Sequence, residues 1–415
     1  MQTPSVRWRA PLRAHSPHFT VRRTLLSVLF GSAAALSQAA ETPSFPALLQ
    51  QPQANAPQLL EQAANVSAAG ADARQAAAWV NPSVSANAEN LGAPLAGGVS
   101  QRQDTYTVTQ VFEIGGKRSA RIEVKQRRFA AAGARERQVR LAFASELALA
   151  YATAEAMQQH KELVDALVKA SREAELRLAQ ARASAAATQA YVLLASADAT
   201  EALEQLSALV GSTEPFSRID HPFLASFAAA PPKADWTPSE SPALASATAD
   251  RDVVAAQVKL EQRHWIPDIS VSVGMRKFAW SDEKAATVGL TATIPLFDRN
   301  KAGVDAARER ATSAAMRLEA ARLEVLGQHR TALAQVQASE RRFQAAEQGE
   351  AAGTEAYRLG RLGYDAGKTA LLELLAIRRA LSEAKALTID ARLARMRAFV
   401  TLSLAEGRNV FGEAP

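Results

Sequence analysis

Four short segments of the chain alternate between apolar and polar residues with a period of two. The alternation is clean in residues 269–276 and 287–294, and it recurs in residues 83–89 and, less sharply, in residues 105–112. This pattern predicts four β-strands, each with one apolar face. The polar faces carry mainly serine, threonine and glycine, which favours strands that stand between lipid and water over strands of a soluble sheet.

Two very long helical segments follow the second pair of strands. No residue forces a break from 301 to about 366, and a second arm runs from about 371 to 404. At about 1.5 Å per residue the first arm would reach about 100 Å, which is far longer than a helix of a globular domain. Small and apolar residues recur every seven positions, which predicts coiled-coil packing with closely approaching axes. Residues 363–368, GYDAGK, predict the turn of this hairpin.

The chain also carries an internal repeat. Residues 81–89, NPSVSANAE, match residues 266–274, IPDISVSVG, and the segments that follow them match at a similar offset. Each half reads as a short helix, two strands and a long helical region, which predicts two copies of one unit at 41–226 and 243–412. Residues 227–242 between them contain four prolines and small polar residues, a composition typical of a linker.

The helical region of the first unit is the shorter one. The span from Lys117 to Gly211 falls short of the span from Lys301 to Gly407 by nearly two heptads. No glycine or proline marks its turn, and the segment ARASAAATQ around Ser184 is the best candidate. The first hairpin is therefore expected to have unequal arms, which would disturb a six-fold arrangement of hairpin tips in an assembly.

The N-terminus has the composition of an export signal. Arg22 and Arg23 precede an apolar run that ends in small residues. A charged start, an apolar core of about a dozen residues and a small-residue cleavage site predict that residues 1–40 form a signal peptide. That core is too short to cross a membrane as a helix. The long charged region leaves two start sites for translation open, Met1 and Val21.

The amino-acid composition argues against an enzyme, a metal-binding protein and a nucleic-acid-binding protein. The chain has no cysteine, and its six histidines are scattered without the spacing of metal ligands. No catalytic arrangement, cofactor or bound metal is therefore expected, and the chain is predicted not to be an enzyme. The formal net charge is +6, but the first 23 residues hold five arginines and no acid. A nucleic-acid partner is not expected, because the remainder is nearly balanced and its charges suit solvated helix faces.

One stretch invites a different interpretation. Residues 111–120, VFEIGGKRSA, place a glycine pair and a lysine between a strand and a helix, the order of a phosphate-binding loop. That loop needs a glycine where Val111 stands and a serine or threonine where Arg118 stands. The stretch is therefore interpreted as a joint at which glycines let the backbone bend from strand into helix. The residues assigned to the two such joints are Gly115, Gly116, Lys117, Arg118, Asp298 and Arg299.

The number of strands predicts an assembly. Four strands cannot enclose a lumen, because about eight are needed. Open strand edges in lipid are strongly unfavourable, because each unpaired backbone group there costs several kcal/mol. Three copies would instead share one 12-stranded β-barrel, which their helical hairpins would continue as an α-helical barrel. A barrel in one membrane that continues as a helical tube is a conduit.

The chain resembles the TolC-like outer membrane efflux family, and within it the outer membrane components of cobalt–zinc–cadmium type tripartite exporters. The segments that carry the resemblance are NPSVSANAENLG, QVFEIGGKR, PDISVSVGMR and TIPLFDRNKAGVDAARE. The resemblance implies a homotrimer in outer membrane lipid with a periplasmic helical portion. It also implies two partners, a periplasmic adaptor (membrane fusion) protein and an inner-membrane RND pump. The implied cargo is divalent heavy-metal cations, driven by the pump.

The resemblance further implies a gate at the turn of the second hairpin. In the family, acidic side chains and hydrogen bonds close the tip, which maps onto Glu373, six positions after Gly367, and onto Tyr364, three before it. Where the family often has a second acid, this chain has Ala376. An ordinary solvated Glu373 and a packing Tyr364 are the alternatives. The tip position makes three residues candidates for adaptor docking: Lys368, Thr369 and Leu371.

Two further interpretations stay open at this point. The chain could be a structural coiled-coil protein of the periplasm that carries a small sheet, or the same duct could serve organic compounds. The uncharged alternating strands and the export signal favour a duct over a structural protein. The sequence itself does not identify the cargo, because the pump would select it.

Overall fold

The computed structural model describes most of the chain after the predicted signal peptide. That segment, residues 1–40, lies outside the described residues, which are 42–50, 56–95, 97–173, 180–227, 231–281 and 283–408.

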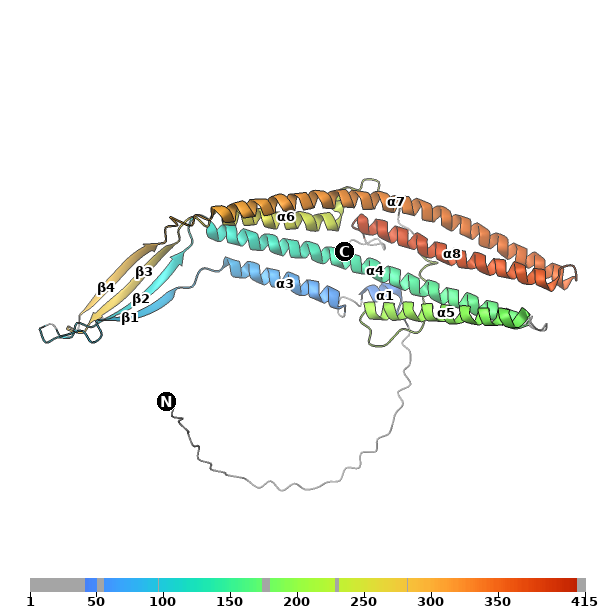
Figure 1. Ribbon diagram of the computed structural model, residues 1–415, viewed down its shortest axis with the longest axis horizontal. Helices are drawn as coiled ribbons and strands as arrows, with labels where there is room; N and C mark the ends of the chain where they lie inside the picture. Colours follow the sequence, from blue (N-terminus) through green and yellow to red (C-terminus); the bar gives the residue numbers. More distant parts are fainter. Residues whose placement is uncertain are drawn as a thin grey trace, which may run out of the picture. The chain divides into compact units, whose positions relative to one another are not determined.

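The four predicted strands form one antiparallel sheet (Figure 1). They are β1 (Ser83–Glu89), β2 (Gln103–Phe112), β3 (Ile269–Phe278) and β4 (Lys284–Ala292), and they lie side by side in chain order. The central pairing joins β2 of the first repeat to β3 of the second. The two repeats therefore share a single sheet, and β1 and β4 are its edges.

In the middle rows of the sheet, the register places apolar side chains on one face and polar or small side chains on the other. Val108 pairs with Val84 on one side and with Val273 on the other, and Val273 pairs with Val288. The rows between them carry polar or small residues, such as Gly274 opposite Thr107 and Thr287. The apolar face is open in the single chain, since Val288 is 79% exposed and Leu290 74%. An exposed apolar face of this size marks a surface that contacts another molecule or lipid.

Long helices make up the rest of the structure (Figure 1). In the first repeat α4 (Lys117–Glu173) packs against α5 (Gln180–Leu209), and in the second α7 (Lys301–Asp365) packs against α8 (Leu371–Ala405). The helices α4 and α7 have 57 and 65 residues. The two arms predicted for the second hairpin are confirmed almost to the residue.

Among the described residues three helices precede the strands, whereas the sequence predicted one short helix per repeat. A short α1 (Phe45–Gln50) and a longer α3 (Pro57–Ala77) begin the first repeat, and α6 (Pro242–Glu261) begins the second. The helix α3 packs on α4, and α6 lies between α4 and α7. A single 3-10 turn, Pro238–Glu240, leads into α6.

The expected turn of the first hairpin was misplaced. Ser184 lies inside α5, which already begins at Gln180, and α4 ends at Glu173. The residues from Gln180 onward are rich in alanine, which has the highest helix propensity, so the helix continues through the segment that was expected to turn. Residues 174–179 lie outside the described part of the chain.

The main core gathers residues from both repeats. Phe45 of α1 stacks on Phe223 at 4.5 Å between ring centroids, and Tyr151 of α4 packs edge-on against both rings. Met396 of α8 belongs to the same cluster. Alanines such as Ala152 are fully buried between the helices, which lets the helix axes approach closely. Within the described residues, no helix is both long and apolar enough to cross a membrane.

One carboxylate is buried in this core. Glu155, on α4, is 4% exposed, and its Oε2 accepts hydrogen bonds from the backbone N–H groups of Phe223 at 2.7 Å and Leu224 at 2.9 Å. Its Oε1 accepts a third from Gln159 at 3.0 Å. Burial raises the pKa of Glu155, although the two backbone donors oppose the shift. The carboxylate thereby fixes the chain that follows α5 against the middle of α4.

Replacing Glu155 by alanine should lower the free energy of unfolding by about 3 kcal/mol, because two buried backbone donors would lose their acceptor. Glu155→Gln keeps an acceptor oxygen and should lose much less. Urea unfolding of the purified protein, followed by circular dichroism at neutral pH, measures both variants. If both variants lose the same unfolding free energy, Glu155 does not stabilise the fold as an acceptor of these hydrogen bonds.

The same residue predicts a pH dependence. Because the folded state raises the pKa of Glu155, its contribution is fully present below the unfolded value of about 4.5 and declines as the pH rises through the folded value. Glu155→Gln should therefore gain stability relative to the wild type as the pH is raised over that range. If the difference in unfolding free energy between the two proteins does not change with pH, the titration of Glu155 is not coupled to folding.

Candidate functional site

The first strand-to-helix joint is a left-handed bend that fits only glycine at one of its two positions. Gly115 and Gly116 have φ of +66° and +79°. A β-carbon on Gly115 would lie 2.6 Å from Cγ2 of Ile266, which is closer than van der Waals contact allows, whereas one on Gly116 would meet only Ser119 at 3.4 Å. Gly115 is therefore held between the two repeats, because Ile266 leads into β3.

The cations of this joint have structural partners. The Lys117 ammonium lies 2.9 Å from Asp268, which ties the start of α4 to the start of β3. Arg118 donates to the Ala77 carbonyl oxygen and covers the ring of Trp79 at 4.8 Å. These contacts occupy the two side chains that a phosphate-binding loop would have directed toward its ligand.

The second joint uses asparagine where the first uses glycine. Asn300 has φ of +53°, and it stands directly before Lys301, the first residue of α7, just as Gly116 stands directly before α4. The Asp298 carboxylate accepts the Asn300 backbone N–H at 2.9 Å. Arg299 is exposed. The two repeats thus place a left-handed residue at the same point by different means.

The Asn300 side chain fastens this bend to the preceding helix. Its amide nitrogen donates to the backbone oxygen of Glu261 at 3.1 Å and to the Glu261 carboxylate at 2.8 Å. The hydrogen bond from Asn300 is the main reason that the pKa of Glu261 is lowered. Sequence reasoning missed Asn300, although asparagine is the residue that best tolerates left-handed backbone after glycine.

The turn of the second hairpin is closed by backbone hydrogen bonds. Gly367 has φ of +69°, and its N–H donates to the carbonyl of Tyr364 at 2.9 Å. The carbonyl of Gly363 accepts the N–H groups of Lys368 at 2.7 Å and Thr369 at 3.2 Å. A left-handed glycine with this bonding pattern is a common way to end a helix. The turn therefore presents Lys368 to solvent and holds Thr369 against α7.

Glu373 and several leucines are exposed around this turn. Glu373 lies in the first turn of α8, where a negative charge is favourable beside the positive end of the helix dipole. Leu371 is exposed, and the adjacent Leu372 is 81% exposed. The structure thus brings the predicted gate residues Tyr364 and Glu373 to the same end of the hairpin as the predicted docking residues. Their roles stay predictions.

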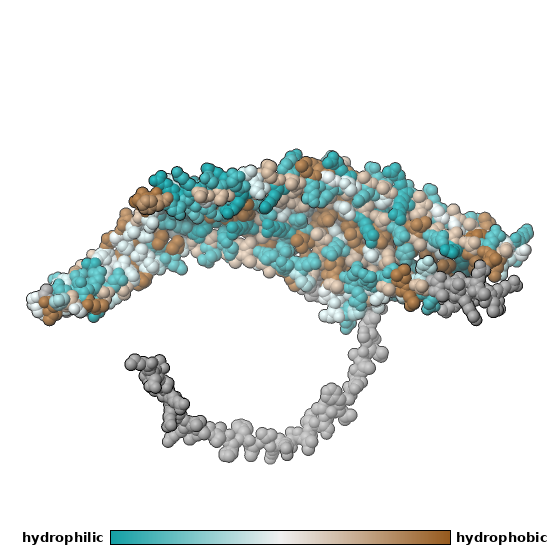
Figure 2. Space-filling view, in the orientation of Figure 1, coloured by the Kyte–Doolittle hydropathy of each residue, from teal (hydrophilic) through white to brown (hydrophobic). Residues whose placement is uncertain are grey.

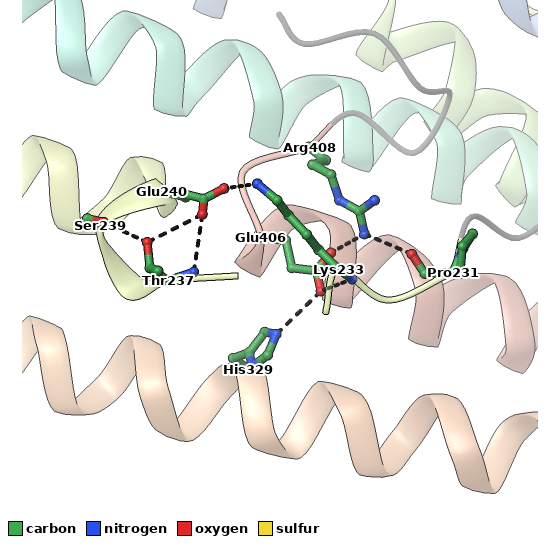
Figure 3. Close-up of polar contacts among 8 residues, drawn as sticks. All are labelled: Pro231, Lys233, Thr237, Ser239, Glu240, His329, Glu406 and Arg408. Carbon is green, nitrogen blue, oxygen red and sulfur yellow. Dashed lines mark hydrogen bonds and ion pairs between the residues drawn. The ribbon is translucent and has the colours of Figure 1, made fainter. Parts of the chain in front are cut away.

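A buried carboxylate joins the linker to the end of the second hairpin (Figure 3). The fully buried Glu406, just after α8, accepts the Lys233 backbone N–H at 3.2 Å and lies 3.4 Å from Nε2 of His329. Arg408 pairs with the same carboxylate. The ring of Trp236, in the linker, stacks on His329 at 3.8 Å. The linker is therefore fixed at once to α7 and to the end of α8.

His329 is one of the six histidines that the sequence shows as scattered. Its partners stand far away along the chain, and no local motif connects them. Within the part of the chain that the structure describes, no group of three or more histidine, aspartate or glutamate residues could hold a metal ion.

Comparison with known proteins identifies relatives along most of the chain. A family model described as outer membrane efflux protein matches residues 48–212 and 237–408. The nickel-cobalt-cadmium resistance protein NccC of Alcaligenes xylosoxydans xylosoxydans is 52% identical over 391 residues, which cover 91% of this chain and 89% of that protein. The nickel and cobalt resistance protein CnrC of Cupriavidus metallidurans is 51% identical, over 92% of this chain and 94% of CnrC.

Solved structures support the fold independently. A crystal structure of CusC, described in terms of transmembrane channel formation, superposes with a TM-score of 0.74. It covers 90% of this chain and 96% of its own, at 18% sequence identity. The TolC-like fold expected from the sequence is thereby confirmed.

The joints predict a graded response to substitution. Gly115→Ala should lower the free energy of unfolding by about 3 kcal/mol, since a left-handed backbone and a clash with Ile266 both oppose it. Gly116→Ala meets only the backbone cost of about 1–2 kcal/mol. The midpoints of urea unfolding of the two variants give the comparison. The reverse order would contradict the packing of Gly115 against Ile266.

Proposed function

The chain belongs to the outer membrane efflux protein family, and on this basis we propose that it is the exit duct of a tripartite efflux system. In this role it receives cargo from an inner-membrane pump through a periplasmic adaptor and conducts it passively across the periplasm and the outer membrane. The observation that carries the proposal is one sheet with an exposed apolar face, joined by rigid bends to two long helical hairpins.

A homotrimer is the assembly that suits this sheet. The strand order leaves β1 and β4 as edges, and β1 is exposed along its whole length. Edges of this kind are unfavourable in lipid, because their backbone groups have no water to bond to. Three copies that pair β4 of one with β1 of the next would close the sheet and direct every apolar face outward.

The polar face and the hairpins would then form a continuous passage. Threonine, serine and glycine line the inner face of such a closed sheet, at positions such as Thr107, Ser272 and Thr287. These side chains bond to water without binding cargo strongly. The helices of three copies would continue the passage into the periplasm. A structural protein would have no use for an apolar face of this extent on its sheet.

Divalent nickel, cobalt and cadmium ions are the proposed cargo. The support is the description of NccC and CnrC as resistance proteins for these metals, at about half identity over nearly the whole chain. The cations would pass as substrate rather than as resident cofactors. The pump would supply both the energy and the selection.

The function can be tested in a metal-sensitive bacterium that carries the matching pump and adaptor. Adding this chain should raise the tolerated concentrations of nickel, cobalt and cadmium together, because cargo would then leave the cell completely. Growth on graded metal concentrations is the measurement. Unchanged tolerance, or a protein that is monomeric and soluble without detergent, would reject the duct.

The gate assignment predicts a change in conductance. Three Glu373 carboxylates near one axis would repel one another and attract cations, so Glu373→Ala should raise single-channel conductance in planar bilayers and weaken block by divalent cations. Glu383→Ala, an exposed acid further along α8, is the control and should leave both unchanged. If Glu373→Ala behaves like the control, Glu373 is an ordinary solvated residue.

A further inference from the structure

The apolar face of the sheet gives way to charged residues where β4 passes into α7. Apolar residues continue beyond the strand at Ile294 and Leu296, and Phe297 is fully exposed. The next residues are Asp298 and Arg299. Figure 2 shows a hydrophobic patch at this corner, directly beside the hydrophilic start of α7. An apolar surface that ends within two residues at charged side chains marks the depth at which a hydrocarbon layer would end.

Large aromatic side chains gather at the same end of the sheet. Trp79, just before β1, is 61% exposed, and Trp265, just before β3, is 56% exposed. The ring of Trp79 lies 6.5 Å from that of Phe112, the last residue of β2. Exposed aromatic rings at the ends of outward-facing strands are typical of a membrane–water interface. In both repeats the aromatic rings therefore indicate that the membrane–water interface lies at the strand-to-helix joints.

The charges of the two joints do not balance. Arginine and lysine outnumber the acids: Glu113 pairs with Arg121 and Asp268 with Lys117, whereas Glu261 and Asp298 accept hydrogen bonds from the neutral Asn300. Four cations in the joints have no ion pair with any described residue: Arg118, Arg263, Arg299 and Lys301.

Two of these cations are available to a ligand from outside. Arg118 is engaged by Trp79 and a carbonyl oxygen, and Arg263 donates to the Gly115 carbonyl at 3.2 Å. Arg299 and Lys301 are exposed and make no ion pair with any described residue. Both precede or begin α7, whose positive helix end adds to their potential. A negative group is therefore expected beside them.

We propose that Arg299 and Lys301, at the same end of the sheet as the exposed rings of Trp265 and Phe297, bind the phosphate headgroup of an anionic phospholipid in the leaflet that faces the periplasm. The proposal rests on the proposed membrane location. Its basis is the combination on one surface of an apolar band, interfacial aromatic rings and unpaired cations. The acyl chains would cover the apolar face, and the phosphate would neutralise the two side chains.

The test compares three proteins purified as assembled channels and placed in nanodiscs of phosphatidylcholine, with and without phosphatidylglycerol. The double variant Arg299→Gln/Lys301→Gln removes the two charges. Arg317→Gln removes an exposed charge further along α7 and serves as the control. Native mass spectrometry counts the phosphatidylglycerol molecules that each protein retains over phosphatidylcholine, and a salt titration accompanies it.

The double variant should hold phosphatidylglycerol roughly tenfold or more weakly than the wild type, because each cation near a membrane surface adds attraction for anionic lipid. The control should match the wild type, and Arg299→Lys/Lys301→Arg should restore retention. Equal retention in the double variant and the wild type would overturn the proposal. So would complete displacement of the lipid by inorganic phosphate, which would show a site for a free anion.

Channel conductance of the same samples separates this proposal from the proposed function. The double variant should conduct like the wild type, since the proposal places the two residues against lipid rather than in the passage. Loss of lipid retention in a protein that never conducts would leave the lipid site standing and reject the duct. A conducting protein with unchanged lipid retention would leave the duct standing and reject the lipid site.

Discussion

The direction in which each long helix leaves the sheet depends on one backbone conformation that most residues avoid. The first repeat obtains the left-handed bend with Gly115 and Gly116, and the second obtains it with Asn300. Glycine adopts it without steric cost, whereas asparagine needs compensation, which here is the pair of hydrogen bonds from its amide to Glu261. These two bends set the direction in which α4 and α7 leave the sheet.

The sheet is a surface that the single chain leaves uncovered. Its register aligns one row of valines across all four strands, and this row is open to the surroundings. The helical cores, in contrast, are closed by the chain itself through small residues and one aromatic cluster. The helices are therefore packed within the single chain, whereas the apolar face of the sheet needs a contact outside it.

Much of the fold could be predicted from the sequence, because the patterns that indicate strands and helices are local. Strand alternation and seven-residue spacing gave the four strands and the helices α7 and α8 nearly to the residue. The turn expected at Ser184 failed because alanine-rich sequence carries no mark of where a hairpin bends. Asn300 was missed because its conformation depends on Glu261, a residue on another helix. The Glu406–His329 contact was missed because its two residues stand 77 positions apart along the chain and meet only in the folded hairpin.

The linker contact also bears on how such a chain could have arisen. Lys233 stands just before the second repeat and Glu406 near its end, yet their backbone and side chain are bonded. The linker that leads into the second predicted repeat and the end of that repeat therefore lie at one place in the fold. A unit whose ends meet can be copied in tandem within a gene without stretching any connection. A tandem copy of such a unit would need only a short segment to bridge the two neighbouring ends.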